Sequence, residues 1–315
     1  MEILKTTAKT GTKIYIFFLK VMIPTLIFVK ILAELGGIEY LAEVLTPVMQ
    51  FLGLSGETGL VVASAAMVNL YAGLSVFSNM DGLQSITLAQ ATTISFLILV
   101  THNMFIEMAV VRMVGLKLPI IIAFRLLSTV FMAWAFITTA NHFGLYQETA
   151  NILIEPQNIH SSFGDWVLNS LKSMGYLFVA VYVIVFMVEL LKALKITNFL
   201  EWILSPFVRM IGINKNATSI TVIGLLLGLA YGGAFFVEEA KKGTIRNRDI
   251  YLSMALLCLT HAIIEDTVLM VVIGGDFMAL IMFRLLITFI LIALLGLIIN
   301  RCSDKVFYKY FFHRK

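Results

Sequence analysis

Long apolar runs separated by short polar segments make up most of the chain. A helix needs about 20 apolar residues to cross a hydrocarbon layer of about 30 Å. The runs that reach this length cover residues 14–35, 91–112, 118–139, 173–195, 250–273 and 277–299. The pattern therefore predicts an all-α polytopic membrane protein.

Each half of the chain also has an interrupted apolar stretch. In the first half, residues 38–55 contain Pro47 and are followed by residues 58–77, and residues 198–236 correspond to them in the second half. The polar segments on both sides of each stretch have the same charge character, which places both ends on one side of the membrane. We expect a re-entrant helical hairpin in each half, although two full crossings would give the same sidedness.

Two of the apolar runs contain nearly the same polar motif. Residues 101–107 (Thr-His-Asn-Met-Phe-Ile-Glu) correspond, 159 positions later, to residues 260–266 (Thr-His-Ala-Ile-Ile-Glu-Asp). Ionisable groups at membrane depth cost free energy and usually face a cavity or a partner. The recurrence in register makes these motifs the first candidates for function.

The same offset relates many other positions, which indicates an internal duplication. Pairs at this offset include Lys13 and Lys172, Pro47 and Pro206, Gly53 and Gly212, Gly115 and Gly274, and Arg125 and Arg284. An offset that is longer by one residue aligns Tyr71 with Tyr231. We expect a first repeat over residues 12–140, an external connector over 141–170, a second repeat over 171–299 and a basic aromatic tail over 300–315, which we interpret as an interfacial anchor.

Basic residues predict the orientation, because Lys and Arg accumulate on the cytoplasmic side. The N-terminal segment carries Lys5, Lys9 and Lys13, and the tail after residue 299 is also basic, so both termini are expected in the cytoplasm. The first hairpin then opens outside and the second opens inside. Each repeat would have about three transmembrane helices plus a hairpin, and the two repeats would have inverted topology, as in many secondary transporters.

Composition excludes several other classes of protein. Of the 315 residues, 60% are hydrophobic and only 13% are charged, whereas soluble domains are nearer 25% charged. The net charge of +4 comes from Lys and Arg beside apolar runs, so we expect no nucleic acid as a partner. Two cysteines, Cys258 and Cys302, provide neither a disulfide framework nor a typical zinc motif.

The two motifs combine imidazole and carboxylate groups. His261 and Glu265 share a helix face, and Asp266 is one residue further on. His102 and Glu107 would be about 140° apart on an ideal helix, so they face different neighbours unless the helix is locally unwound. These five residues suit a divalent metal ion, and the histidines also suit proton coupling. The structural alternative is a buried clamp between helices.

Hydroxyl and amide groups near the motifs form a second set of candidates. The hairpin segments contain Asn69, Tyr71 and Tyr231 beside glycines and small residues, where a helix break can bind an ion or polar solute. Ordinary small-residue helix packing is the alternative. The residues expected to hydrogen-bond a solute are Asn69, Tyr71, Tyr231, Thr101, Asn103 and Thr260.

Four charged residues are expected to form structural ion pairs. Arg125 and Arg284 lie within the runs that follow the motifs, and Glu107 and Asp266 are candidate acidic partners. The alternative is that each arginine reaches the membrane interface. Lys30 and Glu189 are equivalent at the same offset and have opposite charges, so they could pair between the repeats.

The short Pro-containing helices before Gly53 and Gly212, the Tyr-x-Gly turns at Tyr71 and Tyr231, and the polar-centred spans that follow resemble the nucleoside-recognition, or Gate-domain, membrane proteins. That family includes the spore maturation proteins A and B, and gate domains also occur in concentrative nucleoside transporters and ferrous-iron transporters. The chain departs from the iron transporters, because the segments around Asn69 and Tyr231 lack their Gly-Cys-Asn signature. The resemblance implies a bacterial inner-membrane protein.

These observations favour a secondary transporter over two other classes. The preferred substrate is a divalent metal ion, with proton coupling, and a nucleoside-like solute is the alternative; no further cofactor is expected. An enzyme is disfavoured, because the sequence has no HExxH motif or nucleophile–base set. A non-transporting assembly factor is the third reading. The expected partners are the lipid bilayer, the transported ion or solute, and a second copy of the chain.

Overall fold

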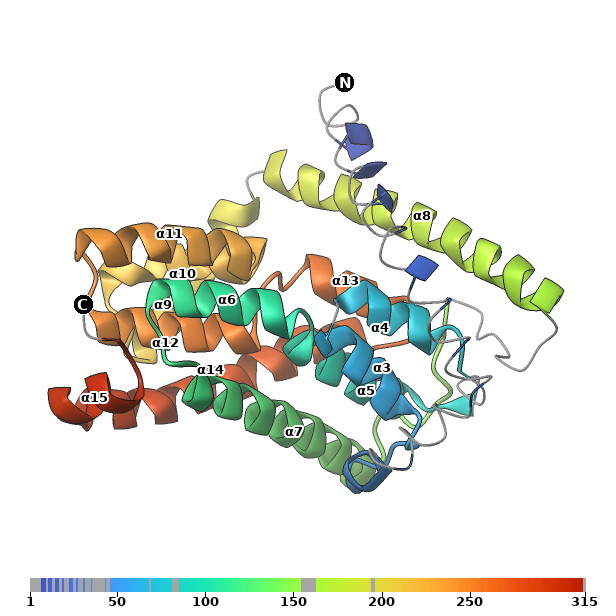
Figure 1. The fold of residues 1–315 in the computed structure, drawn as a ribbon, viewed down its shortest axis with the longest axis horizontal. Coiled ribbons are helices and arrows are strands. Elements are labelled where there is room, and N and C mark those ends of the chain that lie inside the picture. Colours follow the sequence, from blue (N-terminus) through green and yellow to red (C-terminus); the bar gives the residue numbers. More distant parts are fainter. Residues whose placement is uncertain are drawn as a thin grey trace.

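The computed structural model describes residues 46–67, 69–80, 85–153, 163–193 and 196–313, with isolated positions between residues 7 and 43. Within these ranges the regular structure is helical, and extended backbone occurs only as isolated bridges. In Figure 1 several helices, among them α6 (Met104–Val114), α11 (Leu229–Lys242) and α12 (Asn247–Leu259), lie side by side, with α8 (Phe163–Ala193) running obliquely above them and α7 (Leu118–Phe143) obliquely below. The predicted all-α class is confirmed for the described residues.

Two helices match predicted membrane spans closely. These are α7 (Leu118–Phe143) and α14 (Phe277–Arg301), both long and apolar enough to cross a bilayer. Pro119 lies in the first turn of α7, where its missing N–H costs nothing. The Asp276 side chain accepts a hydrogen bond of 2.7 Å from the Ala279 amide and caps α14.

The predicted span 91–112 is two helices and not one. Helix α5 (Leu88–Thr101) and helix α6 (Met104–Val114) are bent by 41° at a short break. Asn103, within the break, has a left-handed backbone with φ of 54°. Of the two alternatives for His102 and Glu107, the helix is therefore locally unwound between them.

The predicted span 250–273 is also broken. Helix α12 (Asn247–Leu259) ends before the second motif, and helix α13 (Glu265–Val271) begins inside it. Ala262 has φ of 44° and occupies the position equivalent to Asn103 at the 159-residue offset. Both motifs thus interrupt their helices, with a left-handed residue at the same place.

A pair of packed helices occupies each of the two segments in which a hairpin was predicted. Helix α3 (Thr58–Met67) packs against α4 (Leu70–Phe77), and α10 (Lys215–Leu227) packs against α11 (Leu229–Lys242). A Cβ atom added to Gly73 would lie 2.8 Å from the Cβ of Ala65, so only glycine permits this approach of α4 to α3. In Figure 1 the pair α3–α4 lies toward the right and the pair α10–α11 toward the left.

The start of each second hairpin helix corrects the alignment of the two tyrosines. Helix α4 begins at Leu70 and α11 begins at Leu229, which is the 159-residue offset without a slip. Asn69 caps α4, since its side chain accepts a hydrogen bond of 2.9 Å from the Ala72 amide. Its equivalent is Gly228, with φ of 103°. Tyr231 is therefore one position further along its helix than Tyr71.

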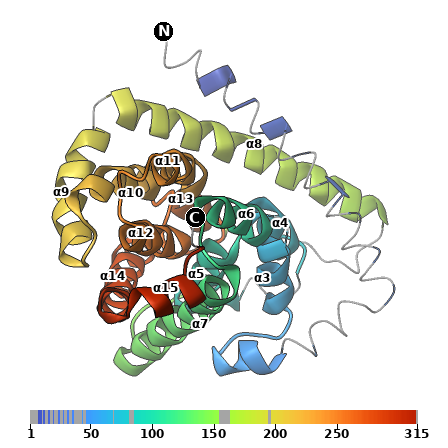
Figure 2. The ribbon, with the colours of Figure 1, turned by 60° about the vertical axis from the view of Figure 1, so that its left-hand side comes forward.

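Two further helices extend the second half of the chain. Helix α8 (Phe163–Ala193) begins before the predicted span 173–195, which shortens the predicted connector. Helix α9 (Ile196–Met210) includes Pro206. Both views show α8 along the outside of the other helices (Figures 1 and 2). Most of the predicted span 14–35, including Lys30, lies outside the described residues, as does the Glu189 side chain.

One end of the molecule collects the segments that are rich in Lys and Arg. The Lys117 ammonium donates to the Lys309 carbonyl at 2.6 Å, and Arg248 donates to the Cys302 carbonyl at 2.8 Å. The Asn214 amide donates to Asp249 at 3.2 Å. The turns before α7, α10 and α12 therefore meet the end of α14.

The opposite end collects segments that were predicted to lie outside the cell. The Leu88 amide donates to the Glu148 carbonyl at 2.8 Å, and the Asp276 amide donates to the Thr92 hydroxyl at 2.9 Å. The Gln90 side chain donates to the Gly53 carbonyl at 3.1 Å. The starts of α5 and α14 therefore lie beside the turn that precedes α3.

The C-terminal tail packs partly on the protein, and its interpretation as an interfacial anchor stays a prediction. Helix α15 (Asp304–Tyr310) buries Phe307, and Phe312 just after it is buried as well, each with 1% exposure. A Cβ atom on Gly115, whose φ is 115°, would lie 2.9 Å from the Phe312 ring. Tyr310 remains 46% exposed.

We predict that Phe307→Ala lowers the free energy of unfolding by about 3 kcal/mol or more, because it leaves a cavity among buried rings. The ring stacks on Phe312 with centroids 5.9 Å apart, and Arg248 lies over its face. The measurement is Tm of the purified protein in detergent. The matched control is Tyr310→Ala, and equal shifts in both variants would contradict the buried packing.

Candidate functional site

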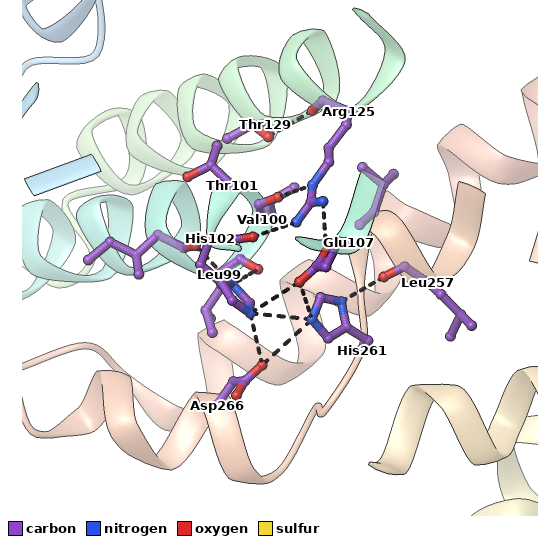
Figure 3. A network of polar contacts seen from close by, with 12 residues as sticks. Leu99, Val100, Thr101, His102, Glu107, Arg125, Thr129, Leu257, His261 and Asp266 are labelled. Carbon is purple, nitrogen blue, oxygen red and sulfur yellow. Dashed lines mark hydrogen bonds and ion pairs between the residues drawn. The ribbon is translucent and has the colours of Figure 1, made fainter. Parts of the chain in front are cut away.

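The two helix breaks bring the two histidines together. The Nε2 atoms of His102 and His261 are 3.3 Å apart, and Figure 3 shows the rings facing each other. Both side chains are almost fully buried. Two residues 159 positions apart in the sequence thus share one site at the crossing of two broken helices.

Two carboxylates approach the same pair of nitrogens. Glu107 Oε1 lies 3.2 Å from His261 Nε2 and 3.6 Å from His102 Nε2. Asp266 Oδ2 lies 3.6 Å from His102 Nε2 and 3.9 Å from His261 Nε2. Because α6 starts after the break, Glu107 faces His102 despite the five-residue spacing (Figure 3).

Backbone carbonyls orient both imidazole rings. His102 Nδ1 lies 3.1 Å from the Leu99 carbonyl oxygen and 3.2 Å from that of Ile98, and His261 Nδ1 lies 2.7 Å from the Leu257 carbonyl oxygen. A carbonyl oxygen only accepts, so Nδ1 carries the hydrogen in each ring. In the neutral rings both Nε2 atoms are then acceptors that point into the site.

With neutral rings, the site therefore gathers acceptor atoms of His102, His261 and Glu107 around one point, and Asp266 Oδ2 lies 3.6 and 3.9 Å from the two nitrogens. The ligand atoms of His102, Glu107 and His261 all lie within 4.8 Å of one another. Around a tetrahedral zinc ion with bonds of about 2.0–2.2 Å, neighbouring ligand atoms are about 3.3–3.6 Å apart. The two nitrogens and Glu107 Oε1 are 3.2–3.6 Å apart, which is close to that value. A bound cation, either a metal ion or a proton, would relieve the repulsion among these lone pairs.

Arg125 fixes the second oxygen of Glu107. Its guanidinium lies 2.7 Å from Glu107 Oε2 and is fully buried. The same group donates to the Val100 carbonyl at 2.6 Å and to the His102 carbonyl at 3.1 Å (Figure 3). The predicted pairing of Arg125 with an acid is present, and its partner is Glu107.

Arg284 does not form the equivalent ion pair. It donates to the Leu259 carbonyl at 3.0 Å and to the Leu99 carbonyl at 3.3 Å. Among the described residues, none of its nitrogens lies within ion-pair distance of a carboxylate, and Nη1 has no hydrogen-bond acceptor. The predicted pairing with Asp266 is therefore wrong in this conformation, because Asp266 faces the histidines.

The hydroxyl groups of the two motif threonines form hydrogen bonds within the protein. Thr101 donates to the Leu97 carbonyl at 2.6 Å, and Thr260 shares a hydrogen bond of 2.7 Å with Thr288, a partner that the motif comparison missed. Thr288 is equivalent to Thr129 of the first half, so the 159-residue offset could have identified it. The hydroxyls of Thr101 and Thr260 thus hold the ends of α5 and α12.

The remaining predicted residues lie around the site. The backbone N–H of Asn103 donates to the Ala65 carbonyl at 3.1 Å and joins the first break to α3. Glu265 is the first residue of α13 and is half-buried, and Tyr71 is half-buried on α4, close enough to interact electrostatically with Glu265 and Asp266. The Tyr231 side chain lies outside the described set.

The helices and the buried polar site define an all-helical membrane protein. The chain is 28% identical over 270 residues to a protein of Bacillus subtilis (strain 168) named "Uncharacterized membrane protein YvoD", a match that covers 84% of the chain and 85% of that relative. No family model matches the chain, and no solved structure matches it. The nucleoside-recognition resemblance therefore stays a prediction.

We predict that Arg125→Met destabilises the protein by about 3–5 kcal/mol, because it leaves the Glu107 carboxylate buried without its cation. Adding Glu107→Gln to that variant should recover part of the loss, since the unpaired charge is then removed. The measurement is unfolding of the purified protein in detergent. Arg112→Met is the matched control on an exposed arginine and should change stability by less than about 0.5 kcal/mol. Full additivity of the two site substitutions would argue against the ion pair.

Proposed function

We propose that the chain is a membrane transporter for a divalent metal cation, which it moves by alternating access between two inverted repeats. The observation that carries the proposal is the buried set of ligand atoms from His102, His261 and Glu107, with Asp266 Oδ2 3.6–3.9 Å from both nitrogens. Two imidazoles with two carboxylates suit zinc, iron or manganese. Their carbonyl-bound Nδ1 atoms supply the outer contacts that usually orient such ligands.

The positions of the helix pairs support the inverted arrangement. The turn before α3 contacts the end where α5 and α14 begin, through Gln90 and Gly53. The turn before α10 contacts the other end, through Asn214 and Asp249. In Figure 1, α5 and α12 run from opposite ends toward the middle. Two hairpins that open at opposite ends, with a site between them, are expected of an alternating-access transporter.

The charge distribution supports the orientation that we propose. Lys and Arg concentrate at the end formed by the turns before α7, α10 and α12 and by α15, and this end is assigned to the cytoplasm. The end formed by the starts of α5 and α14 is assigned to the outside. The C-terminus is then cytoplasmic in a bacterial inner membrane, and the N-terminal Lys residues favour the same side for the N-terminus.

Buried acceptors without a donor also explain why protons would be coupled to the metal. A metal ligand must be deprotonated, so metal and proton compete for the same nitrogen lone pairs. In the metal-free state, a proton at the crossing of His102 and His261 is the available substitute cation. Exchange of the metal for protons would let the site cross the hydrocarbon layer without an uncompensated cluster of lone pairs.

A nucleoside-like solute is the second candidate function, and the resemblance to Gate-domain proteins favours it. Such a solute would need free hydrogen-bonding groups, but the hydroxyls of Thr101 and Thr260 are already bonded within the fold. The Asn69 carbonyl oxygen caps α4. The cation is therefore preferred. A non-transporting assembly factor would tolerate neutral replacement of both histidines.

We predict near-stoichiometric metal in protein purified gently without chelator, and loss of that metal in both His102→Ala and His261→Ala. Loss of an outer contact typically weakens metal binding by about 10–100-fold, so loss of a ligand should cost at least as much. Elemental analysis of the purified protein measures this. His142→Ala, on an exposed histidine at the end of α7, is the matched control. Absence of metal in the wild type would exclude a tightly bound metal.

We also predict that metal affinity falls as the pH is lowered, because protons compete with the metal for the Nε2 lone pairs. Uptake into liposomes should accordingly release protons from the site, and a pH indicator with a metal-sensitive dye measures both. Metal uptake without proton movement would argue against coupling. If the protein neither takes up metal nor binds it, a non-transporting assembly factor becomes the favoured function.

A further inference from the structure

Two short segments, one after α7 and one after α14, lie back across the protein. Gly144, with φ of 63°, ends α7, and we call residues 145–153 after it the connector strap. Residues 302–313 follow α14 and include α15, and we call them the tail strap. Since α7 and α14 are equivalent at the 159-residue offset, the two straps occupy equivalent places in the chain, at opposite ends of the molecule.

The connector strap joins the start of α5, in its own repeat, to the turn before α14, in the other repeat. The Ala150 N–H donates to the Ile86 carbonyl at 3.0 Å. Further along the strap, the Leu153 N–H donates to the Val272 carbonyl at 2.9 Å. A Cβ atom added to Gly274, whose φ is 86°, would lie 2.9 Å from the Cβ of Ala150, so the strap lies directly on this turn.

The tail strap joins the start of α12, in its own repeat, to the turn before α7, in the other repeat. The Arg248 guanidinium donates to the Asp304 carboxylate at 2.7 Å. The His313 N–H donates to the Gly115 carbonyl at 2.8 Å. The close approach of the Phe312 ring to Gly115 makes this contact as tight as the one at the other end.

The contacts of the two straps are related by the same offset as the repeats. Helices α5 and α12 begin at residues 88 and 247, and Gly115 and Gly274 both have positive φ and both lie under the strap of the other repeat. Each repeat is therefore held at one end of the molecule by the strap of its partner repeat.

Each strap also spans the helices that separate the proposed cation site from one end of the molecule. Helix α6 starts at the break beside the site, ends before Gly115 and packs against α11 and α12. A Cβ atom on Gly233 of α11 would overlap the Val110 side chain of α6, so these helices are in close contact. A cation that leaves toward this end needs α6 to move away from α11 and α12. The tail strap opposes that movement, because it ties the end of α6 to the start of α12.

The same geometry holds toward the other end. Helix α13 starts inside the second motif, packs against α5 and ends at Val271, just before the turn that contains Gly274. The connector strap ties this turn to the start of α5. Separation of α13 from α5 would therefore strain the hydrogen bonds of the connector strap.

We propose that the two straps are the latches of alternating access. The tail strap must release the Gly115 turn before the site opens to the cytoplasmic end, and the connector strap must release the Gly274 turn before it opens to the outside. The inference rests on the proposed function for its role in transport. With one latch closed at all times, the site would not be open to both ends together.

The test is a disulfide that fixes the tail strap to the other repeat. Leu116 and Phe312 form an antiparallel bridge flanked by two hydrogen bonds. The Cα atoms of such a pair are about 4.5 Å apart, which is within the range of about 4.4–6.8 Å that a disulfide spans. Leu116→Cys/Phe312→Cys is made with Cys302→Ser and reconstituted in liposomes. Oxidation should lower Co²⁺ uptake by about tenfold or more, and a reductant should restore it in the same protein.

The matched control is a disulfide at the equivalent bridge within one repeat. Thr87 and Thr149 form the same kind of antiparallel bridge between the connector strap and its own repeat. Oxidation of Thr87→Cys/Thr149→Cys should change Co²⁺ uptake by less than about twofold, because the strap can still leave the Gly274 turn. An equal loss of uptake in this control would overturn the latch.

The outcomes separate the latch from the proposed function. If uptake is the same in the oxidised and reduced forms of Leu116→Cys/Phe312→Cys, the latch is wrong and the proposed function stands. If the wild type takes up no Co²⁺, the proposed function fails, and the reaction of Cys258 with a small thiol reagent decides. Cys258 is fully buried on α12, so its labelling reports opening of this helix. A cross-link that slows this labelling about tenfold supports the latch, and an unchanged rate overturns it.

A second variant keeps the test decisive if the cross-linked protein does not fold. Lys117→Ala/Asp304→Asn removes side-chain bonds of the tail strap to the Lys309 carbonyl and to Arg248, and leaves the buried rings in place. Labelling of Cys258 should then be faster than in the wild type. An unchanged rate would overturn the latch.

Discussion

The structure depends on one electrostatic constraint: two imidazole nitrogens and a carboxylate oxygen meet at a buried point between two broken helices, with a second carboxylate beside them. His102 and His261 point their Nε2 atoms at each other from 3.3 Å, and Glu107 approaches both. Uncompensated, this arrangement is repulsive in a medium that screens charge poorly. A cation or protons at its centre would relieve this repulsion, which is the physical basis of the proposed cation site.

The helix breaks that create the site also create a second problem, which the arginines solve. A broken helix leaves carbonyls without their usual donors, and lipid provides none. Arg125 donates to the Val100 and His102 carbonyls at the first break. Arg284 donates to the Leu259 carbonyl at the second break, and Val100 and Leu259 are equivalent at the 159-residue offset. Each buried guanidinium therefore stabilises a helix end while holding a positive charge beside the site.

The sequence could predict which residues meet, but not how the backbone brings them together. Apolar length predicted α7 and α14, and the offset of 159 linked His102 with His261. Apolar runs cannot reveal a left-handed residue within them, and Ala262 adopts one at a cost of roughly 1–2 kcal/mol that only tertiary contacts can offset. The sequence also could not predict that Phe307 packs on the protein, because an aromatic residue gives the same composition signal whether it contacts lipid or protein.

The two halves differ most in the length of one acidic side chain. Glu107 is long enough to give one oxygen to the histidines and the other to Arg125, at 3.2 Å from His261 and 2.7 Å from the guanidinium. Asp266 is one methylene shorter, and among the described residues it reaches the histidines but not Arg284. Two glutamates would allow both arginines to be paired inside the chain. With one aspartate, the second guanidinium lies beyond ion-pair distance of its acid, and this difference makes the repeats inequivalent despite their matching breaks.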